Sequence, residues 1–175
     1  MQAADKSPAR ETFLVGFGVT KLGAVLVAKS GQGVTAILLG DDANRLRGEL
    51  SKAFPAVELV ENELAMADTV ATVAAFVDAP QSGLALPLDM RGSPLELEVW
   101  NALRRIPSGE TRTYGALAKT LAVLATPQEV GAACAANVLA VAVPCHRVVK
   151  ADGSISGYRW GVHRKRRLIN AEGVA

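Results

Sequence analysis

Hydrophobic and polar positions give the first part of the chain an alternation of short β-rich runs and helical stripes. The β-rich runs are separated by glycine-containing turns and cover residues 12–20, 23–29 and 34–39. A helix is predicted from a cap at Asp41 or Asp42 to about Phe54, and a second from about Glu63 to Val77. This pattern predicts a sheet covered by helices.

The second part of the chain has mostly helical periodicity. Apolar positions share one face between Ser93 or Pro94 and Arg105, which predicts a helix there. A short helix is expected over residues 113–121, and another over 126–136, where Thr126-Pro127-Gln128-Glu129 has the form of a capping box. Two short helices joined by a turn are typical of a helix-turn-helix, although any antiparallel helix pair fits the same pattern.

The composition is that of an ordinary globular protein, but its charge is unevenly distributed. Of 175 residues, half are hydrophobic. Residues 1–90 carry a net charge of −4, whereas residues 91–175 carry +6, which fits a polyanion-binding surface and a merely solvated basic surface about equally well. The polar stretch 1–11 has no signal-peptide pattern, and the apolar run 138–145 is too short to span a membrane. We therefore expect a cytoplasmic protein with reduced thiols.

Candidate chemistry is concentrated where Cys145 is followed directly by His146 and Arg147. A thiol reacts as its thiolate, and both neighbours are expected to favour that form. Pro144 biases the chain before it towards an extended conformation, so the cysteine is expected where a buried strand turns into a loop.

Other groups around this cysteine leave several readings open. Cys134 lacks such neighbours and is interpreted as a buried apolar residue. A histidine base usually needs a third, orienting group, for which Glu172, Glu110 and Asp152 are all candidates. A zinc site is not expected, because the spacings of the cysteines and histidines match no common ligand pattern.

The segment Pro144-Cys145-His146-Arg147-Val148 resembles the signature of the O6-alkylguanine-DNA alkyltransferases, in particular the C-terminal domain of the bacterial adaptive-response protein Ada. The resemblance extends over roughly residues 14–173 and includes blocks at 37–42, 86–89, 132–137 and 156–161. It implies an α/β plus α fold, with a small RNase H-like domain at 1–83 and a helical domain with a helix-turn-helix at 84–175. It also implies suicide repair, in which a methyl group moves irreversibly from O6 of a flipped guanine to Cys145.

The resemblance assigns a role to each matching residue. The catalytic set comprises the nucleophile Cys145, its water-mediated base His146, the orienting Glu172, Asn137 in the active-site turn, and Tyr114 as proton donor to guanine. The expected substrate-binding residues are Val148 (through its carbonyl), Tyr158, Arg159 and Trp160. The expected DNA-binding residues are Gln128, Gly131, Ala132, Ala135, Arg112, Thr113 and Arg147. The expected partner is double-stranded DNA containing O6-methylguanine, bound by a monomer without cofactor, metal or membrane.

Two residues, Gln128 and Trp160, are expected to affect DNA binding and the size of the alkyl group that is accepted. Gln128 stands where the family normally has an arginine that fills the hole left by the flipped base, so weaker duplex binding is expected. The five basic residues that we expect to compensate on the phosphates are Arg91, Arg104, Arg105, Arg112 and Lys119. Trp160, in the loop expected to cover the site, should favour methyl over benzyl groups.

Three other functions remain as alternatives. A non-catalytic damage-recognition protein would keep the fold without using the cysteine. A Cys-His-Glu hydrolase would turn over and release its product. A transcriptional regulator would need a damage-sensing domain supplied by a partner.

Overall fold

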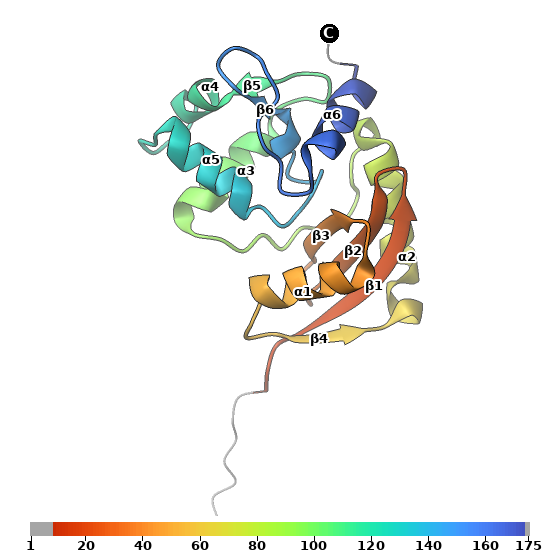
Figure 1. Cartoon of the computed structure of the whole chain (residues 1–175). Coiled ribbons are helices and arrows are strands. Elements are labelled where there is room, and N and C mark those ends of the chain that lie inside the picture. Colours follow the sequence, from red (N-terminus) through yellow and green to blue (C-terminus); the bar gives the residue numbers. More distant parts are fainter. Residues whose placement is uncertain (1–8, 174–175) are drawn as a thin grey trace, which may run out of the picture.

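The computed structural model describes residues 9–173 and has an α/β fold, in which a sheet lies beside a mainly helical part (Figure 1). The sheet has the strand order β3-β2-β1-β4, with β1 antiparallel to β2 and parallel to β4. Its strands are β1 (Thr12–Thr20), β2 (Gly23–Lys29), β3 (Val34–Gly40) and β4 (Glu58–Glu61). The first three strands confirm the sequence prediction, whereas β4 was missed because four residues are too few to show an alternation.

Two helices pack on this sheet, α1 (Ala43–Ala53) and α2 (Glu63–Asp78). Figure 1 shows α1 crossing in front of the strands and α2 running beside and behind β1. Glycines bring α2 close to the sheet, since a Cβ at Gly16 or at Gly18 would lie only 2.7 Å from a side-chain atom of α2. The interface is therefore too tight for a side chain at either glycine.

The helical part follows from residue 94 onwards. Its helices are α3 (Pro94–Arg104), α4 (Tyr114–Lys119), α5 (Pro127–Ala136) and α6 (Val162–Ala171), with a short 3₁₀ turn η2 (Cys145–Arg147). Another 3₁₀ turn, η1 (Pro80–Ser82), lies in the segment that connects α2 to this part. A small parallel pair is formed by β5 (Arg112–Thr113) and β6 (Val148–Val149). Both α3 and α5 begin with a complete capping box, at Ser93 and at Thr126, which confirms the predicted starts of these helices.

The two parts share one continuous hydrophobic core. The free edge of β3 accepts two segments of the second part, through isolated bridges from Val34 to Leu88 and from Ile37 to Leu139. These segments cover backbone groups that an edge strand would otherwise expose. The turn that precedes Cys145 is consequently anchored on the sheet.

The expectation that a buried strand leads into Cys145 is wrong for the apolar residues 138–143 that precede it. Apart from the bridge at Leu139, this stretch forms turns, and Val141 has a φ of 69°, a left-handed conformation that is unusual for a β-branched residue. Apolar runs of this length do not distinguish a strand from other buried backbone. Within residues 9–173, no helix combines the length and the hydrophobicity required to cross a bilayer.

Candidate active site around Cys145

Cys145 is held in place by Asn137, the residue that ends α5. The Asn137 side-chain nitrogen donates to the Val143 carbonyl at 2.9 Å and to the Cys145 Sγ at 3.4 Å, and its oxygen accepts from the Leu139 N–H at 2.8 Å. Asn137 is itself only 1% exposed. One buried amide therefore holds both the turn and the thiol in position.

The thiol borders a cavity of about 350 Å³. Its lining residues are Tyr114, Gly131, Cys134, Ala135, Cys145, Gly157, Tyr158 and Arg159. They come from α4, α5, η2 and the loop before α6. A cavity of this size, with few polar groups, is typical of a small-ligand site.

Behind the cysteine, one carboxylate joins His146 and Arg147. Glu172, whose side chain is fully buried, lies 2.8 Å from His146 Nε2 and accepts from Arg147 Nη2 at 2.9 Å and from Arg147 Nε at 3.1 Å. Burial works to raise the pKa of Glu172, but the hydrogen bonds and charges of these two partners prevail and lower it to about 2. Of the three orienting groups considered from the sequence, it is Glu172 that meets His146.

The histidine is held as a neutral ring. Burial lowers the pKa of His146, against the opposing influence of Glu172. An ionised carboxylate at Nε2 selects the tautomer with hydrogen on that nitrogen, which leaves Nδ1 as the acceptor. Nδ1 is buried and has no hydrogen-bond partner among the described residues.

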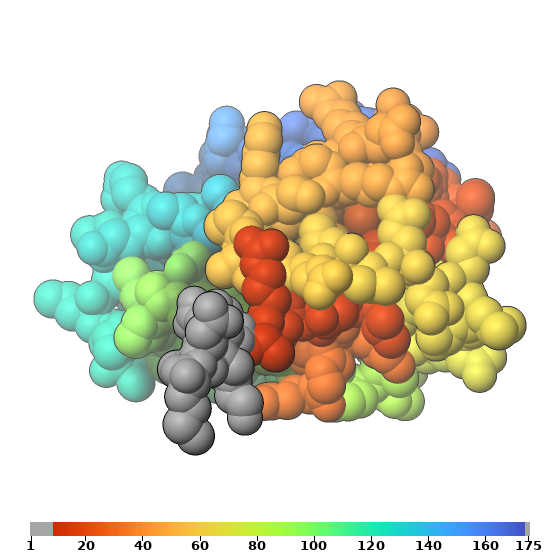
Figure 2. Space-filling model, turned by 90° about the horizontal axis from the view of Figure 1, so that it is seen from below, coloured from red at the N-terminus to blue at the C-terminus, as the bar shows by residue number. Residues whose placement is uncertain are grey.

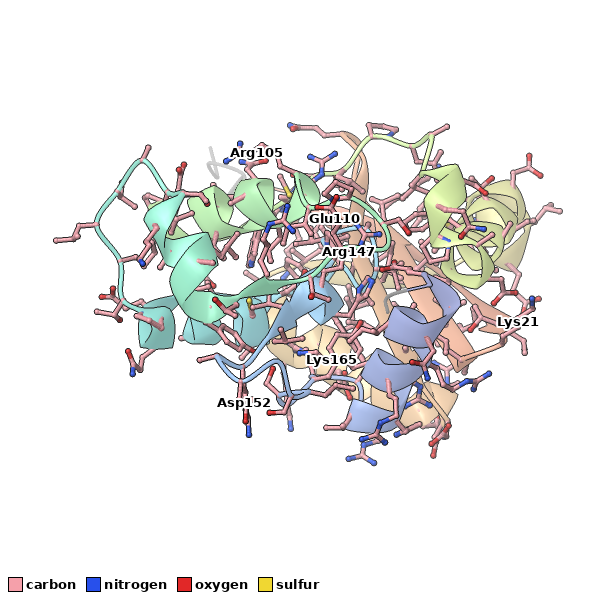
Figure 3. All side chains as sticks on the ribbon, turned by 90° about the horizontal axis from the view of Figure 1, so that it is seen from above. Lys21, Arg105, Glu110, Arg147, Asp152 and Lys165 are labelled. Carbon is pink, nitrogen blue, oxygen red and sulfur yellow. The ribbon has the colours of Figure 1, made fainter. Side chains whose placement is uncertain are left out.

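The expectation that Arg147 binds DNA and activates the thiol does not fit its position. Its side chain is 10% exposed, and its guanidinium donates to Glu172 and to the Ile106 carbonyl, the latter from Nη1 at 2.7 Å. Figure 3 shows Arg147 within the molecule, between elements distant in sequence. It is a structural ion-pair partner, and the sequence neighbours of a cysteine need not be its spatial neighbours.

A different cation acts on the thiol through its charge. Burial raises the pKa of Cys145, and the hydrogen bond from Asn137 and the charge of Lys165 oppose that increase. Lys165 is 1% exposed and donates from Nζ to Ser156 Oγ at 2.8 Å. Ser156 Oγ also lies 2.5 Å from Tyr114 Oη. Neither Lys165 nor Ser156 was selected from the sequence, where the lysine is one of several basic residues in an amphipathic helix.

Of the four expected substrate-binding residues, two line the cavity and two, Val148 and Trp160, do not. Tyr158 and Arg159 line it, and Arg159 also donates to the Ala135 carbonyl at 3.2 Å. The Val148 side chain is buried, so any contact with a bound base is through its backbone. Trp160 does not line the cavity, contrary to expectation, but packs edge-to-face against Tyr158 with ring centroids 5.2 Å apart.

One face of α5 is both exposed and composed of small residues. Gln128, Ala132 and Ala135 are exposed and Gly131 is partly exposed, whereas Val130 and Ala133 on the other face are buried. The Glu129 carboxylate turns back and accepts a hydrogen bond from the Thr126 N–H at 2.7 Å, as part of the capping box. This arrangement leaves a smooth helix face, as a narrow groove requires.

The basic residues expected near this face differ in availability. Arg104, Arg105 and Lys119 are exposed, and Arg112 is exposed while paired with Glu110 at 2.7 Å. Thr113 caps α4. Arg91 is engaged elsewhere, in ion pairs with Glu11 and Asp89. Figure 2, which views the sheet side, shows the α4–α5 region projecting at one edge of the molecule, away from α2.

Comparison with known proteins places this site in a family. Residues 94–174 match the family profile described as the DNA-binding domain of 6-O-methylguanine DNA methyltransferase. The methylated-DNA–protein-cysteine methyltransferase of Candida albicans is 34% identical over 145 residues, which cover 78% of this chain and 82% of that protein. The chain belongs to the methylated-DNA–protein-cysteine methyltransferase family.

Two further relatives extend this result. The bifunctional transcriptional activator/DNA repair enzyme Ada of Escherichia coli is 47% identical over 152 residues, which cover 87% of this chain but 43% of that protein. The chain thus spans less than half the length of the Ada proteins that it matches. A Mycobacterium tuberculosis OGT in complex with DNA superposes with a TM-score of 0.71 at 28% identity over 92% of each chain. The sheet-plus-helices fold is therefore that of solved methyltransferases of this family.

Proposed function

We propose that this chain repairs DNA by accepting the methyl group of O6-methylguanine on Cys145, once per molecule. The observation that carries the proposal is a buried thiol at the wall of a base-sized cavity, backed by a hydrogen-bonded His146–Glu172 pair. Membership of a methyltransferase family supports the reaction class. The product is a thioether, which has no leaving group that the site can expel, so the reaction stops after one event.

In the first step, the Cys145 thiol transfers its proton to His146. The ionised Glu172 holds hydrogen on Nε2, so Nδ1 is the nitrogen that accepts the proton, through a water as the family resemblance implies. The Sγ electron pair then attacks the methyl carbon, and the carbon–O6 bond breaks. Asn137, through its hydrogen bond to Sγ, keeps the sulfur in line for this displacement.

As the bond to the methyl group breaks, negative charge builds up on the departing guanine. Tyr114 lines the same cavity as the thiol, which supports assigning to its phenol the role of proton donor to guanine N3. Burial raises the pKa of Tyr114, which keeps the phenol protonated. Tyr158 and Arg159 form the cavity wall, and the Val148 carbonyl is assigned to the guanine amino group.

DNA binding is assigned to the α4–α5 pair, interpreted as a helix-turn-helix with α5 as the recognition helix. Its exposed small residues permit close approach to a groove, and Gln128 is assigned to the space left by the flipped base. The exposed Arg104, Arg105 and Lys119 are assigned to phosphates. Within this proposal, residues 1–83 are an RNase H-like domain, residues 84–175 the DNA-binding and transfer domain, and the protein acts as a cytoplasmic monomer.

Intact-protein and peptide mass spectrometry with excess duplex containing one O6-methylguanine tests the proposal. We expect one methyl group on the Cys145 peptide, saturating at one per chain, and none in Cys145→Ser. The matched control Cys134→Ser should still accept one methyl group. Continued turnover would instead indicate a hydrolase, and tight lesion binding without any mass gain would indicate a damage-recognition protein.

A further inference from the structure

Lys165 is a buried cation that the proposed reaction does not yet use. It lies in α6, on the side that faces the rest of the helical part (Figure 3), and is 1% exposed. Among the described residues, the only hydrogen bond or ion pair of its ammonium group is the 2.8 Å bond from Nζ to Ser156 Oγ. Burying an ammonium group without a carboxylate is costly, and such groups are concentrated at functional sites.

The hydrogen-bond chemistry gives this contact a direction. An ammonium group can only donate, so Ser156 Oγ must accept from Lys165. The serine hydroxyl then has its own hydrogen available for Tyr114 Oη, 2.5 Å away. If Tyr114 accepts from Ser156, its phenolic hydrogen is free to point into the cavity.

We propose that Lys165 is the proton source behind Tyr114, acting through Ser156 as guanine departs. The inference rests on the proposed function of the site and deepens it. As the S–C bond forms and the C–O6 bond breaks, Tyr114 gives its proton to guanine N3. Ser156 returns a proton to the Tyr114 oxygen, Lys165 replaces the proton on Ser156, and the resulting neutral amine recovers one from solvent.

The electrostatics of the site support this order of events. Before transfer, the charge of Lys165 lowers the pKa of the Cys145 thiol against the effect of burial. Burial also lowers the pKa of Lys165 itself, so it gives up a proton more readily than an exposed lysine. The same cation thus stabilises the thiolate first and neutralises the leaving group afterwards. Lys165 and Ser156 are positioning residues, since the proton that reaches guanine comes from Tyr114.

A purely structural role is the competing explanation, because the Lys165–Ser156 bond also ties α6 to the loop before it. Methyl donors that differ in their leaving group separate the two roles. Guanine needs a proton as it leaves, whereas iodide does not, so methyl iodide reports only on the thiolate. In 3-deaza-O6-methylguanine a carbon replaces N3, so the leaving base has no atom at that position to accept the proton from Tyr114.

Single-turnover methylation of Cys145 would be measured for wild type and for Ser156→Ala, with Ser156→Thr as the conservative rescue. Ser154→Ala is the matched control, since this serine lies in the same loop, is exposed, and its side chain bonds only to Asp152 among the residues that the structure describes. We expect Ser156→Ala to slow transfer from O6-methylguanine duplex roughly 10- to 100-fold, with no change for methyl iodide and little for the 3-deaza duplex. Ser156→Thr should recover most of the rate.

Lys165 would be tested with Lys165→Met and Lys165→Arg, after circular dichroism has shown that each variant is folded. Lys165→Met should lower the rate of Cys145 methylation with both methyl donors, and should lower it more with the O6-methylguanine duplex than with methyl iodide. An arginine keeps the positive charge but does not give up a proton. Compared with Lys165→Met, Lys165→Arg should therefore restore the rate with methyl iodide but not the rate with the O6-methylguanine duplex.

The relay would be overturned if Ser156→Ala lowered the methylation rate equally with the O6-methylguanine duplex and with methyl iodide. It would also be overturned if Ser156→Ala lowered neither rate. Reaction of wild type with methyl iodide but not with the duplex would instead contradict the proposed function. The two failures are therefore distinguishable in one data set.

Discussion

Replacing Glu172 by glutamine removes the charge that joins Arg147 and His146 while preserving the shape of the side chain. The carboxylate is fully buried and accepts three hydrogen bonds of 2.8–3.1 Å, if His146 carries its hydrogen on Nε2. In the variant, the guanidinium of Arg147 remains buried but has only neutral acceptors, the Ile106 carbonyl and the single amide oxygen of the glutamine. Breaking a buried ion pair in this way typically costs about 3–5 kcal/mol.

The pKa of Glu172 gives an independent magnitude. It is lowered from 4.5 to about 2 in the folded protein, and at about 1.36 kcal/mol per pKa unit this corresponds to roughly 3 kcal/mol of stability. Because the folded pKa is the lower one, this contribution is complete above pH 4.5 and disappears as the pH falls through 2. The difference between wild type and Glu172→Gln should therefore be about 3 kcal/mol at pH 7 and about half of that near pH 3.

Urea unfolding followed by circular dichroism at pH 7, 5, 4 and 3 would measure this difference. Glu110→Gln is the matched control, because Glu110 is half exposed and pairs with Arg112 at the surface. It should change the free energy of unfolding by less than about 0.5 kcal/mol. A loss below about 1 kcal/mol for Glu172→Gln at pH 7, or one that does not shrink towards pH 3, would refute the reasoning.

Three further predictions concern DNA binding, pocket size and helix capping. Gln128→Arg should raise duplex affinity and repair rate several-fold without changing the reaction with free O6-methylguanine base, and unchanged duplex values would contradict the role given to Gln128. O6-Benzylguanine should react slowly with the wild type, and Trp160→Ala, which frees Tyr158, should speed benzylation relative to methylation, as mass spectrometry would show. Glu129→Ala should lower the free energy of unfolding by about 1 kcal/mol through loss of its bond to the Thr126 N–H, whereas Glu129→Gln should retain most of it in the same urea titration.

Local signals predicted the starts of the helices well. Thr126 accepts a backbone N–H at a helix start, as the sequence predicted. Asp42 and Ser93 do the same at positions where the sequence had left Asp41 or Asp42, and Ser93 or Pro94, as the start. A cap acts within three residues and therefore leaves its whole signature in a short stretch of sequence. The turn at Val141 shows the limit, because an apolar stretch does not reveal whether it pairs as a strand or bends against a sheet edge.

The directions of the charged side chains were not predictable in the same way. Arg147 was expected to face DNA and instead bonds Glu172, which lies 25 residues further along the chain. Lys165 was one of several basic residues of α6, of which Arg166 and Arg167 are exposed. Amphipathic spacing describes the faces of a helix, but it does not say which polar groups another element will bring to the buried face.

Residue type and short-range spacing were enough to predict the candidate nucleophile, the histidine beside it and the helices that carry the candidate DNA-binding face. Which charges act on Cys145 became clear from the packing of the folded chain. A charge can be buried only where distant segments supply its partners, and here α6 and the chain end after it bring Lys165 to Ser156 and Glu172 to His146. Electrostatic tuning of the site is therefore a property of the packed molecule and not of the motif.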